Sequence, residues 1–286
     1  MTAPAANALL GYPPEARLLI VNADDFGMCH SVNVAAIRTI EAGLVGSVSL
    51  MVPCPWAWEA MAFLKEHLGL SFAVHLTMLR DFDVYRWGPV CPSTAVRSLV
   101  DRAGFFPIHA DRNSLLQRAR IDDVEREFRA QIELVLAEGL TPSHLDWHSL
   151  ADGGREDIFA LTIDLAWEYG LALRVHDASH GAALRTAGLP VVDHPVLDSY
   201  HMDPAAKHQQ FFSLIQSLPP GLTEWAVHPS LGSAEARALE PETWQVRQAD
   251  YRFLTSDAGI EAVRDSGVVL MDYRELQAAW RAQPAG

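Results

Sequence analysis

The sequence predicts an α/β fold in which seven or eight parallel strands form a TIM-like barrel. Short apolar runs of strand length alternate with longer segments of helical period, which is the pattern of repeated β-α units around a parallel sheet. An open doubly wound sheet is the structural alternative, but the glycine fingerprint G-x-G-x-x-G does not follow the first strand. The 286 residues contain no linker rich in Gly, Ser or Pro, so we expect one domain over residues 1–286.

The expected strands are short apolar runs bounded by polar or helical sequence. The first contains Leu18-Leu19-Ile20-Val21 and the third contains Phe72-Ala73-Val74, while Pro142 argues against a helix in the fourth. The full set covers residues 17–23, 47–52, 70–75, 143–147, 171–175, 189–193, 223–228 and 267–271.

Segments of helical period lie between these strands, and several of them end at a glycine, as at Gly43 and Gly139. They cover residues 31–42, 56–67, 121–138, 155–169, 203–217 and 257–265. Seven or eight such β-α units are enough to close a barrel, and we expect a closed one.

The connection from residue 77 to residue 120 is too long for a simple turn. Insertions of this length in compact domains are usually functional, so we expect a lid or a substrate platform. Its aromatic residues Tyr85 and Trp87 are candidates for stacking on a sugar ring. The alternative is that they only fix the loop to the barrel.

Composition restricts the class of ligand and the compartment. A net charge of −14 without any basic run disfavours nucleic acid, so we expect a neutral or cationic small molecule. Three cysteines without C-x-x-C spacing fit neither a disulfide framework nor a thiolate zinc site, which indicates a reducing compartment. No signal-peptide pattern and no run of about 18 apolar residues occurs. We therefore expect a cytoplasmic protein that binds no membrane, and leave open whether it forms a homo-oligomer.

Polar residues with catalytic chemistry gather at the carboxyl ends of the expected strands, where parallel α/β folds hold their active sites. They are Asp24 and Asp25 after the first strand, His75 in the third, His144, Asp146 and His148 in the fourth, and Arg174 and His228 after later strands. Each has a plainer explanation, such as a helix cap, a core histidine or a surface ion pair. Together, those explanations require several coincidences at one end of one sheet.

The HLDWH segment is informative because side chains alternate along a strand. His144, Asp146 and His148 are expected on one face, with Leu145 and Trp147 on the other. Two imidazoles with a carboxylate between them can provide metal ligands together with an acceptor that fixes a ring tautomer.

The pair Asp24-Asp25 places two like charges at the end of a buried strand. Adjacent carboxylates in a partly dry site repel, so a cation or a donor network must hold both ionised. One divalent cation held by Asp25, His75 and His148 meets this condition and leaves a position for water, as in catalytic metal sites. Asp24 is then available as general base. By ligand softness the two imidazoles favour zinc.

Five motifs in order resemble the YdjC/ChbG-like carbohydrate deacetylases, over residues 17 to about 278. They are NADDFG, VHLT, PSHLDxH, VHP and the closing TSDAGIEAVRDSGVVLMDYREL. The resemblance implies a distorted (β/α) barrel related to polysaccharide deacetylases, a divalent metal that is magnesium in the family, and hydrolysis of an N-acetyl group from a sugar.

The resemblance also assigns roles by position. Metal ligands of the family match Asp25, His75 and His148, the catalytic base matches Asp24, and the acid that protonates the departing amine matches His228. In that mechanism Arg174 would hold Asp24 ionised and oriented, and Asp146 would orient a histidine ring.

Family members often continue the fourth-strand motif with further histidines, where this chain has Ser149, Leu150 and Ala151. His144 therefore stays open as an alternative third ligand. Two other functions also stay open. One is a glycoside hydrolase that uses two separated carboxylates, with Asp146 as the second acid. The other is a barrel that binds sugar without catalysis.

Overall fold

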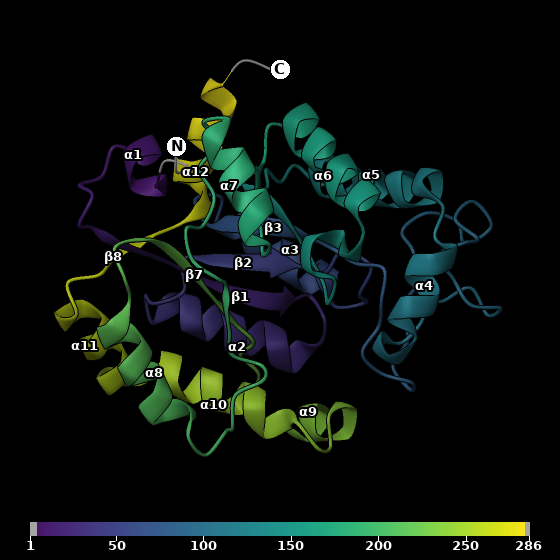
Figure 1. The fold of residues 1–286 in the computed structure, drawn as a ribbon. Helices are drawn as coiled ribbons and strands as arrows, with labels where there is room; N and C mark the ends of the chain where they lie inside the picture. The colour runs from purple at the N-terminus through teal and green to yellow at the C-terminus, as the bar shows by residue number, and fades with distance from the viewer. Residues whose placement is uncertain (1–4, 284–286) are drawn as a thin grey trace.

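The computed structural model describes residues 5–283 and has a central sheet of eight parallel strands between helices (Figure 1). The strands are β1 (Arg17–Phe26), β2 (Ser47–Leu50), β3 (Ser71–Leu76), β4 (His144–Trp147), β5 (Ala172–Leu173), β6 (Leu197–Asp198), β7 (Gly221–Val227) and β8 (Val269–Met271). The α/β class and the parallel arrangement that the sequence predicts are confirmed.

The sheet curls into an incomplete barrel. The strand order is β5-β4-β3-β2-β1-β7-β6, and β8 pairs with β1 beside Leu18–Ile20, before β2 begins to pair with β1 at Asn22. Within residues 5–283 no ladder joins β5 to β6, so the barrel is open between these two short strands. The expectation of a closed barrel is therefore wrong, and the distorted, TIM-like form is confirmed.

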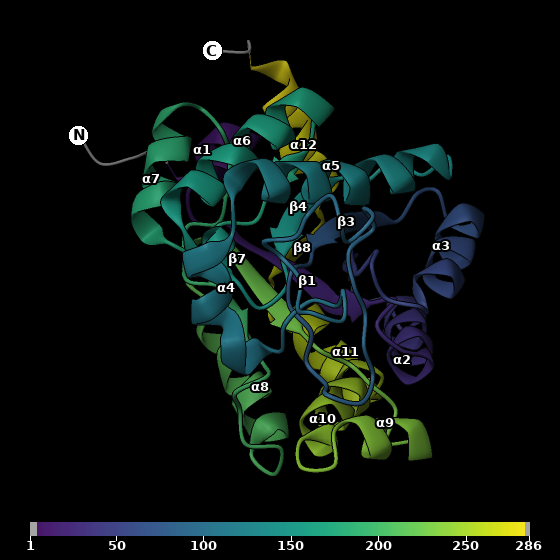
Figure 2. The same cartoon turned by 90° about the vertical axis from the view of Figure 1, so that its right-hand side faces the viewer.

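Two groups of helices cover the sheet, one above it and one below it in the view of Figure 1. The upper group contains α1 (Ala6–Leu10), α5 (Ile121–Ala137), α6 (Glu156–Tyr169), α7 (Ala178–Thr186) and α12 (Tyr273–Ala282). The lower group contains α2 (His30–Glu41), α8 (Lys207–Ser217), α9 (Ala234–Leu239), α10 (Trp244–Leu254) and α11 (Asp257–Asp265). Figure 2 shows α3 (Ala57–Glu66) on one flank and α4 (Arg112–Arg118) at the front.

One expected strand is wrong. Residues 189–193 are buried or nearly so but form no strand, and the sixth strand is the two-residue β6 instead. Pro190 has no N–H for a ladder. The Asp193 carboxylate accepts the backbone N–H groups of Ala6 and Leu222, so this segment is anchored by a side chain at the sheet edge. The expected helices all occur, but α1, α4, α7, α9, α10 and α12 were not predicted.

The inside of the barrel is polar, and its hydrogen bonds join the strands whose ends carry the site. Asn22 donates to Ser49, Ser49 donates to Asp146, and Arg174 pairs with both Asp146 and Glu224. These residues come from five different strands or strand ends, so their hydrogen bonds tie the strands together across the interior. No helix within residues 5–283 is long and apolar enough to cross a membrane.

Candidate active site

A cavity of about 520 Å³ opens at the carboxyl ends of the strands, the end that faces right in Figure 1. Strands β1, β3 and β4 and the residues that follow β5 and β7 form its floor. The 77–120 insertion adds Asp81, His109 and Arg112, and the loop after β6 adds Tyr200 and His201. The cavity thus lies at the strand ends, and residues of the 77–120 insertion form part of its wall.

Asp24 and Asp25 both line this cavity although they are neighbours in a strand. Successive side chains of a regular strand point to opposite faces. Here the pairing of β1 with β2 shifts register between Ala23 and Phe26, and Asp25 has a φ of 67° in the left-handed region. Irregularities of this kind re-aim a side chain, and this one brings both carboxylates to the cavity.

The residues Asp25, His75 and His148 form a buried group whose ligand atoms all lie within 4.8 Å of one another. The Oδ1 atom of Asp25 is 3.1 Å from Nδ1 of His148 and 3.5 Å from Nε2 of His75. One carboxylate oxygen and two imidazole nitrogens are a donor set that fits a divalent metal ion.

The outward-facing polar atom of each of these three residues already has a partner. Asp146 contacts Nδ1 of His75 at 2.7 Å, and Asp81 contacts Nε2 of His148 at 3.0 Å. Arg247 donates from Nη1 to Oδ2 of Asp25 at 2.8 Å. Partners of this type fix the tautomer and orientation of metal ligands. The three atoms that remain, Asp25 Oδ1, His75 Nε2 and His148 Nδ1, are those that face one another.

Charges around the two imidazoles favour a positive charge between them. Burial lowers the pKa of His75, but Asp146 and the other carboxylates outweigh burial and raise it to about 9. Burial acts in the same direction on His148, and Asp81 and Asp25 raise its pKa to about 10. Either protons on the rings or one divalent cation can supply this positive charge.

The Asp24 carboxylate stands beside this group and is held by donors. Arg174 donates to both oxygens, from Nη1 to Oδ2 and from Nη2 to Oδ1, each at 2.8 Å. Asn22 donates to Oδ1 at 2.6 Å. Burial raises the pKa of Asp24, but the Arg174 charge and hydrogen bonds outweigh burial and leave the pKa below its ordinary value. The carboxylate is therefore ionised at the cavity wall.

Arg174 is 1% exposed, which excludes the plainer explanation of a surface ion pair. Its nitrogens also lie 3.0 Å from Oδ2 of Asp146 and 2.7 Å from Oε1 of Glu224. Tyr273, at the start of α12, donates to the other oxygen of Glu224 at 2.5 Å. Arg174 thus contacts three buried carboxylates at once.

His228 follows β7, the strand next to β1 in the sheet, and lies beside Asp24. Its Nε2 lies 3.8 Å from Oδ2 of Asp24, and its Nδ1 lies 3.7 Å from Oδ1 of Asp198. Among residues 5–283 its Nδ1 has no hydrogen-bond partner. The backbone N–H of His228 donates to Asp250 at 2.9 Å, and its ring packs edge-on against Tyr200. The ring is therefore held in place, with its buried Nδ1 on the side of Asp198 and its Nε2 directed at Asp24.

His144 lies deeper in the barrel and outside the Asp25-His75-His148 group. Its ring stacks on Tyr273 with centroids 3.5 Å apart, and its Nδ1 contacts Ser143 at 2.9 Å. Burial lowers its pKa to about 3, so the ring is neutral. Trp147 packs beside Phe159 of α6 with ring centroids 6.1 Å apart, and it also borders the cavity.

Tyr85 and Trp87 do not line the cavity. Trp87 is 2% exposed and donates from its indole to the carbonyl of Leu79, and Tyr85 donates to the carbonyl of Met28. Their rings pack on one another with centroids 5.7 Å apart. These contacts match the alternative explanation, in which the aromatics fix the loop, and the tyrosine in the cavity wall is Tyr200.

Sequence reasoning missed Arg247, Asp81 and Tyr200. Arg247 lies on α10, a helix that was not predicted, and no strand end is near it in the chain. Asp81 and Tyr200 lie in long connections, where sequence alone gives no register. One signal was present for Asp81, because it lies in the 77–120 insertion that was predicted to be functional.

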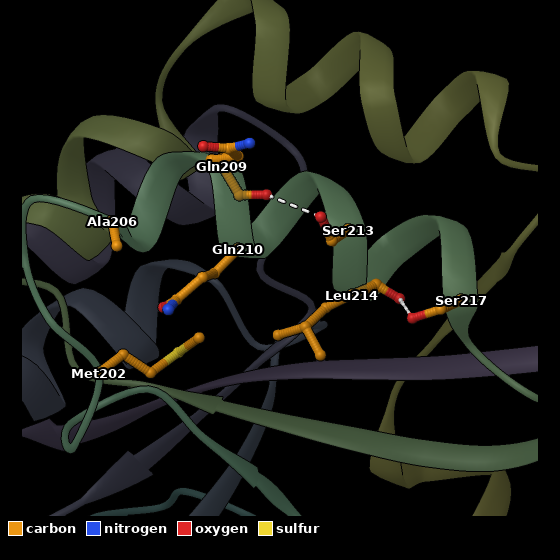
Figure 3. A pocket seen from close by; sticks show the side chains of 7 residues that line it. All are labelled: Met202, Ala206, Gln209, Gln210, Ser213, Leu214 and Ser217. Carbon is orange, nitrogen blue, oxygen red and sulfur yellow. Dashed lines mark hydrogen bonds between the residues drawn. The ribbon is translucent and has the colours of Figure 1, made fainter.

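A second hollow of about 490 Å³ lies along α8 (Figure 3). Met202 and Leu214 supply apolar side chains and Gln210 supplies a polar one. No titratable side chain is among its lining residues in the described part of the chain, so it offers no acid-base or metal chemistry.

Comparison with known proteins shows similarity along almost the whole chain. The model of a family described as YdjC-like protein matches residues 18–265. A carbohydrate deacetylase of Geobacillus stearothermophilus is 33% identical over 266 residues, which cover 91% of this chain and 98% of that protein. A carbohydrate deacetylase of Thermoanaerobacter pseudethanolicus is 29% identical over 261 residues, which cover 91% of this chain and 100% of that protein.

Similarity extends to solved structures. A crystal structure of an Enterococcus faecalis V583 protein, named for cellobiose-phosphate cleavage, aligns with a TM-score of 0.77 and 26% identity. The alignment covers 91% of this chain and 99% of that chain.

Proposed function

This chain belongs to the YdjC-like protein family, and on that premise we propose that it is a metal-dependent hydrolase that removes an N-acetyl group from an N-acetylated sugar or short oligosaccharide. One observation carries the proposal: a carboxylate and two imidazoles face one another at a cavity, beside a second, ionised carboxylate and the ring of His228. The names of the two carbohydrate deacetylases support the type of substrate.

In this proposal Asp25, His75 and His148 hold one divalent cation. When bound, the cation would make a water more acidic and stabilise negative charge on the acyl oxygen. The two imidazoles favour zinc by ligand softness, whereas the family resemblance implies magnesium. His144 is the less favoured third ligand, because it lies outside the Asp25-His75-His148 group and its Nε2 is buried.

Asp24 acts as general base and takes a proton from the attacking water. Water then adds to the acyl carbon, and the C–N bond breaks as His228 gives a proton to the departing amine nitrogen. The 3.8 Å between His228 Nε2 and Asp24 Oδ2 supports this assignment, because groups this close together can both reach one reacting centre in the cavity. Arg174 is a positioning residue, since it fixes both oxygens of Asp24.

The insertion over residues 77–120 would act as a substrate platform. It contributes Asp81, His109 and Arg112 to the cavity, and the bridge from Arg80 to Ile108 closes it into a compact loop. We also propose a single catalytic domain with a small-molecule sugar substrate.

The test couples elemental analysis of purified protein to an acetate-release screen over N-acetylated mono- and oligosaccharides. We expect about one zinc or magnesium ion per chain and release of acetate from at least one sugar. Reducing ends released without acetate would favour a glycoside hydrolase. Tight sugar binding with neither metal nor acetate would favour a binding protein.

A further inference from the structure

Two buried arginines line the cavity, and they differ in how many of their nitrogens are already engaged. Arg174 directs all three guanidinium nitrogens at Asp24, Asp146 and Glu224. Arg247, which is 3% exposed, donates from Nε to Glu240 at 2.7 Å and from Nη1 to Asp25 at 2.8 Å. Its Nη2 donates to no residue within 5–283 and is not among the fully buried atoms that lack a partner.

The free nitrogen is fixed in place. Glu240 and Asp25 hold two sides of the guanidinium, and its carbon lies 5.1 Å from the centre of the Tyr200 ring. Burial lowers the pKa of Arg247, but Glu240 and Asp25 outweigh burial and raise it well above its ordinary value. The group is therefore a permanent cation with one unpaired donor, and the residue lines the cavity.

The position of the Arg247 Nη2 atom indicates which part of a substrate it would contact. Nη2 is bonded to the same carbon as Nη1, so it lies next to the carboxylate that would hold the metal. Negative charge that develops on a substrate at this point meets Asp24, Asp25 and Asp81 as like charges. Because Arg174 is already shared by three carboxylates, Arg247 is the buried cation with a donor left for the substrate.

We infer that Arg247 is a catalytic residue that donates from Nη2 to the acyl oxygen of the substrate. This inference rests on the proposed function. When water adds to the acyl carbon, the C=O π electrons move onto this oxygen, and a donor that is already in place stabilises the charge without reorganisation. The same nitrogen would bind a carboxylate oxygen of acetate, the product.

The test compares Arg247→Lys with Arg252→Lys. Both residues are arginines of α10, but Arg252 is exposed and does not line the cavity. A lysine at position 247 can still pair with Asp25 but cannot present a second, fixed donor. We expect Arg247→Lys to keep its metal content and a KM within about threefold of wild type while kcat falls by roughly 10²–10³. Arg252→Lys should retain kcat.

A second measurement does not depend on turnover. Isothermal titration with sodium acetate at constant ionic strength should show binding that is roughly 10- to 100-fold weaker in Arg247→Lys than in wild type, the loss of one charged hydrogen bond. If Arg247→Lys does not fold, Arg247→Gln is used, and both measurements are expected to change in the same direction.

Three results would overturn the inference: an unchanged kcat, a defect confined to KM, or a defect that excess metal restores. Failure of the proposed function looks different, because wild-type protein would then release no acetate from any sugar. That result would overturn both the proposed function and the role of Arg247. An active wild type with an equally active Arg247→Lys variant overturns only the role of Arg247.

Discussion

Asp24 and Arg174 form a doubly hydrogen-bonded ion pair in the cavity wall, with both nitrogen–oxygen distances at 2.8 Å and 150 residues between them in the chain. Bidentate pairs of this kind fix the carboxylate plane as well as its charge. Asp25, the next residue, has no such clamp on the oxygen that faces His75 and His148. Two adjacent aspartates are thus separated by their partners into one candidate base and one candidate metal ligand.

Replacement of Asp24 by Asn should separate catalysis from metal binding. The amide cannot accept a proton from water, so we expect Asp24→Asn to keep its metal while kcat falls roughly 10²-fold or more. Acetate release and elemental analysis measure the two properties. Asp164→Asn, at an exposed position of α6, is the matched control and should behave as wild type. An Asp24→Asn enzyme with full turnover would remove Asp24 from the mechanism.

Loss of Arg174 should destabilise the whole fold. The substitution Arg174→Met leaves the carboxylates of Asp24, Asp146 and Glu224 buried without their common cation. Removal of one partner of a buried ion pair costs about 3–5 kcal/mol, and we expect the free energy of unfolding in urea to fall by that amount. Arg97→Met, at an exposed site, should change it by less than about 0.5 kcal/mol. Equal stability of the two variants would contradict the role of Arg174 as the common ion-pair partner of the three carboxylates.

Much of the fold can be predicted from sequence because burial produces periodic patterns. The apolar run of β1 and the helical period of α5 are long enough to be distinguished. The two-residue strand β6 has no period to detect, and its bounds depend on pairing with Trp225 and Ala226 of β7. The sheet opens beside this strand, so the same short element explains both the wrong strand and the wrong expectation of closure.

The site is predictable to the extent that it lies at strand ends. Parallel strands bring Asp24, His75 and Arg174 to one edge whatever the details of the loops. Two features escape this argument. The left-handed φ of Asp25 depends on a local shift of register, and the residue type at that position does not predict this shift. Arg247 reaches the site from a helix that is 222 residues away from Asp25 in the chain.

Metal affinity should rise with pH. Acidic neighbours raise the pKa of His75 to about 9 and that of His148 to about 10, so protons compete for the same nitrogens below these values. Because a metal ligand must be a neutral imidazole, affinity is greatest above the raised pKa values and falls as pH falls through them. Titration calorimetry at several pH values should show up to about two protons released per metal ion. Binding without proton release would place the metal elsewhere.

Tyr273 should support the base from the bottom of the barrel. Its hydroxyl donates to Glu224, whose other oxygen accepts from Arg174, which in turn holds Asp24. In Tyr273→Phe one oxygen of Glu224 is left buried without a donor, which costs about 1–3 kcal/mol of unfolding free energy. Burial already raises the pKa of Glu224, so loss of the Tyr273 hydroxyl favours the protonated form of Glu224. Protonation of Glu224 would weaken its ion pair with Arg174.

The matched control for this substitution is Tyr251→Phe, whose hydroxyl contacts the exposed Arg38 and lies outside the chain of contacts from Tyr273 to Asp24. Urea denaturation should place Tyr273→Phe well below this control, and acetate release should be slower in Tyr273→Phe alone. Tyr273 neither lines the cavity nor belongs to the Asp25-His75-His148 group. A slower rate in Tyr273→Phe would therefore indicate that the effect on Asp24 passes through Glu224 and Arg174. Equal stability and equal rates in the two variants would show that Arg174 holds Asp24 without the hydrogen bond from Tyr273 to Glu224.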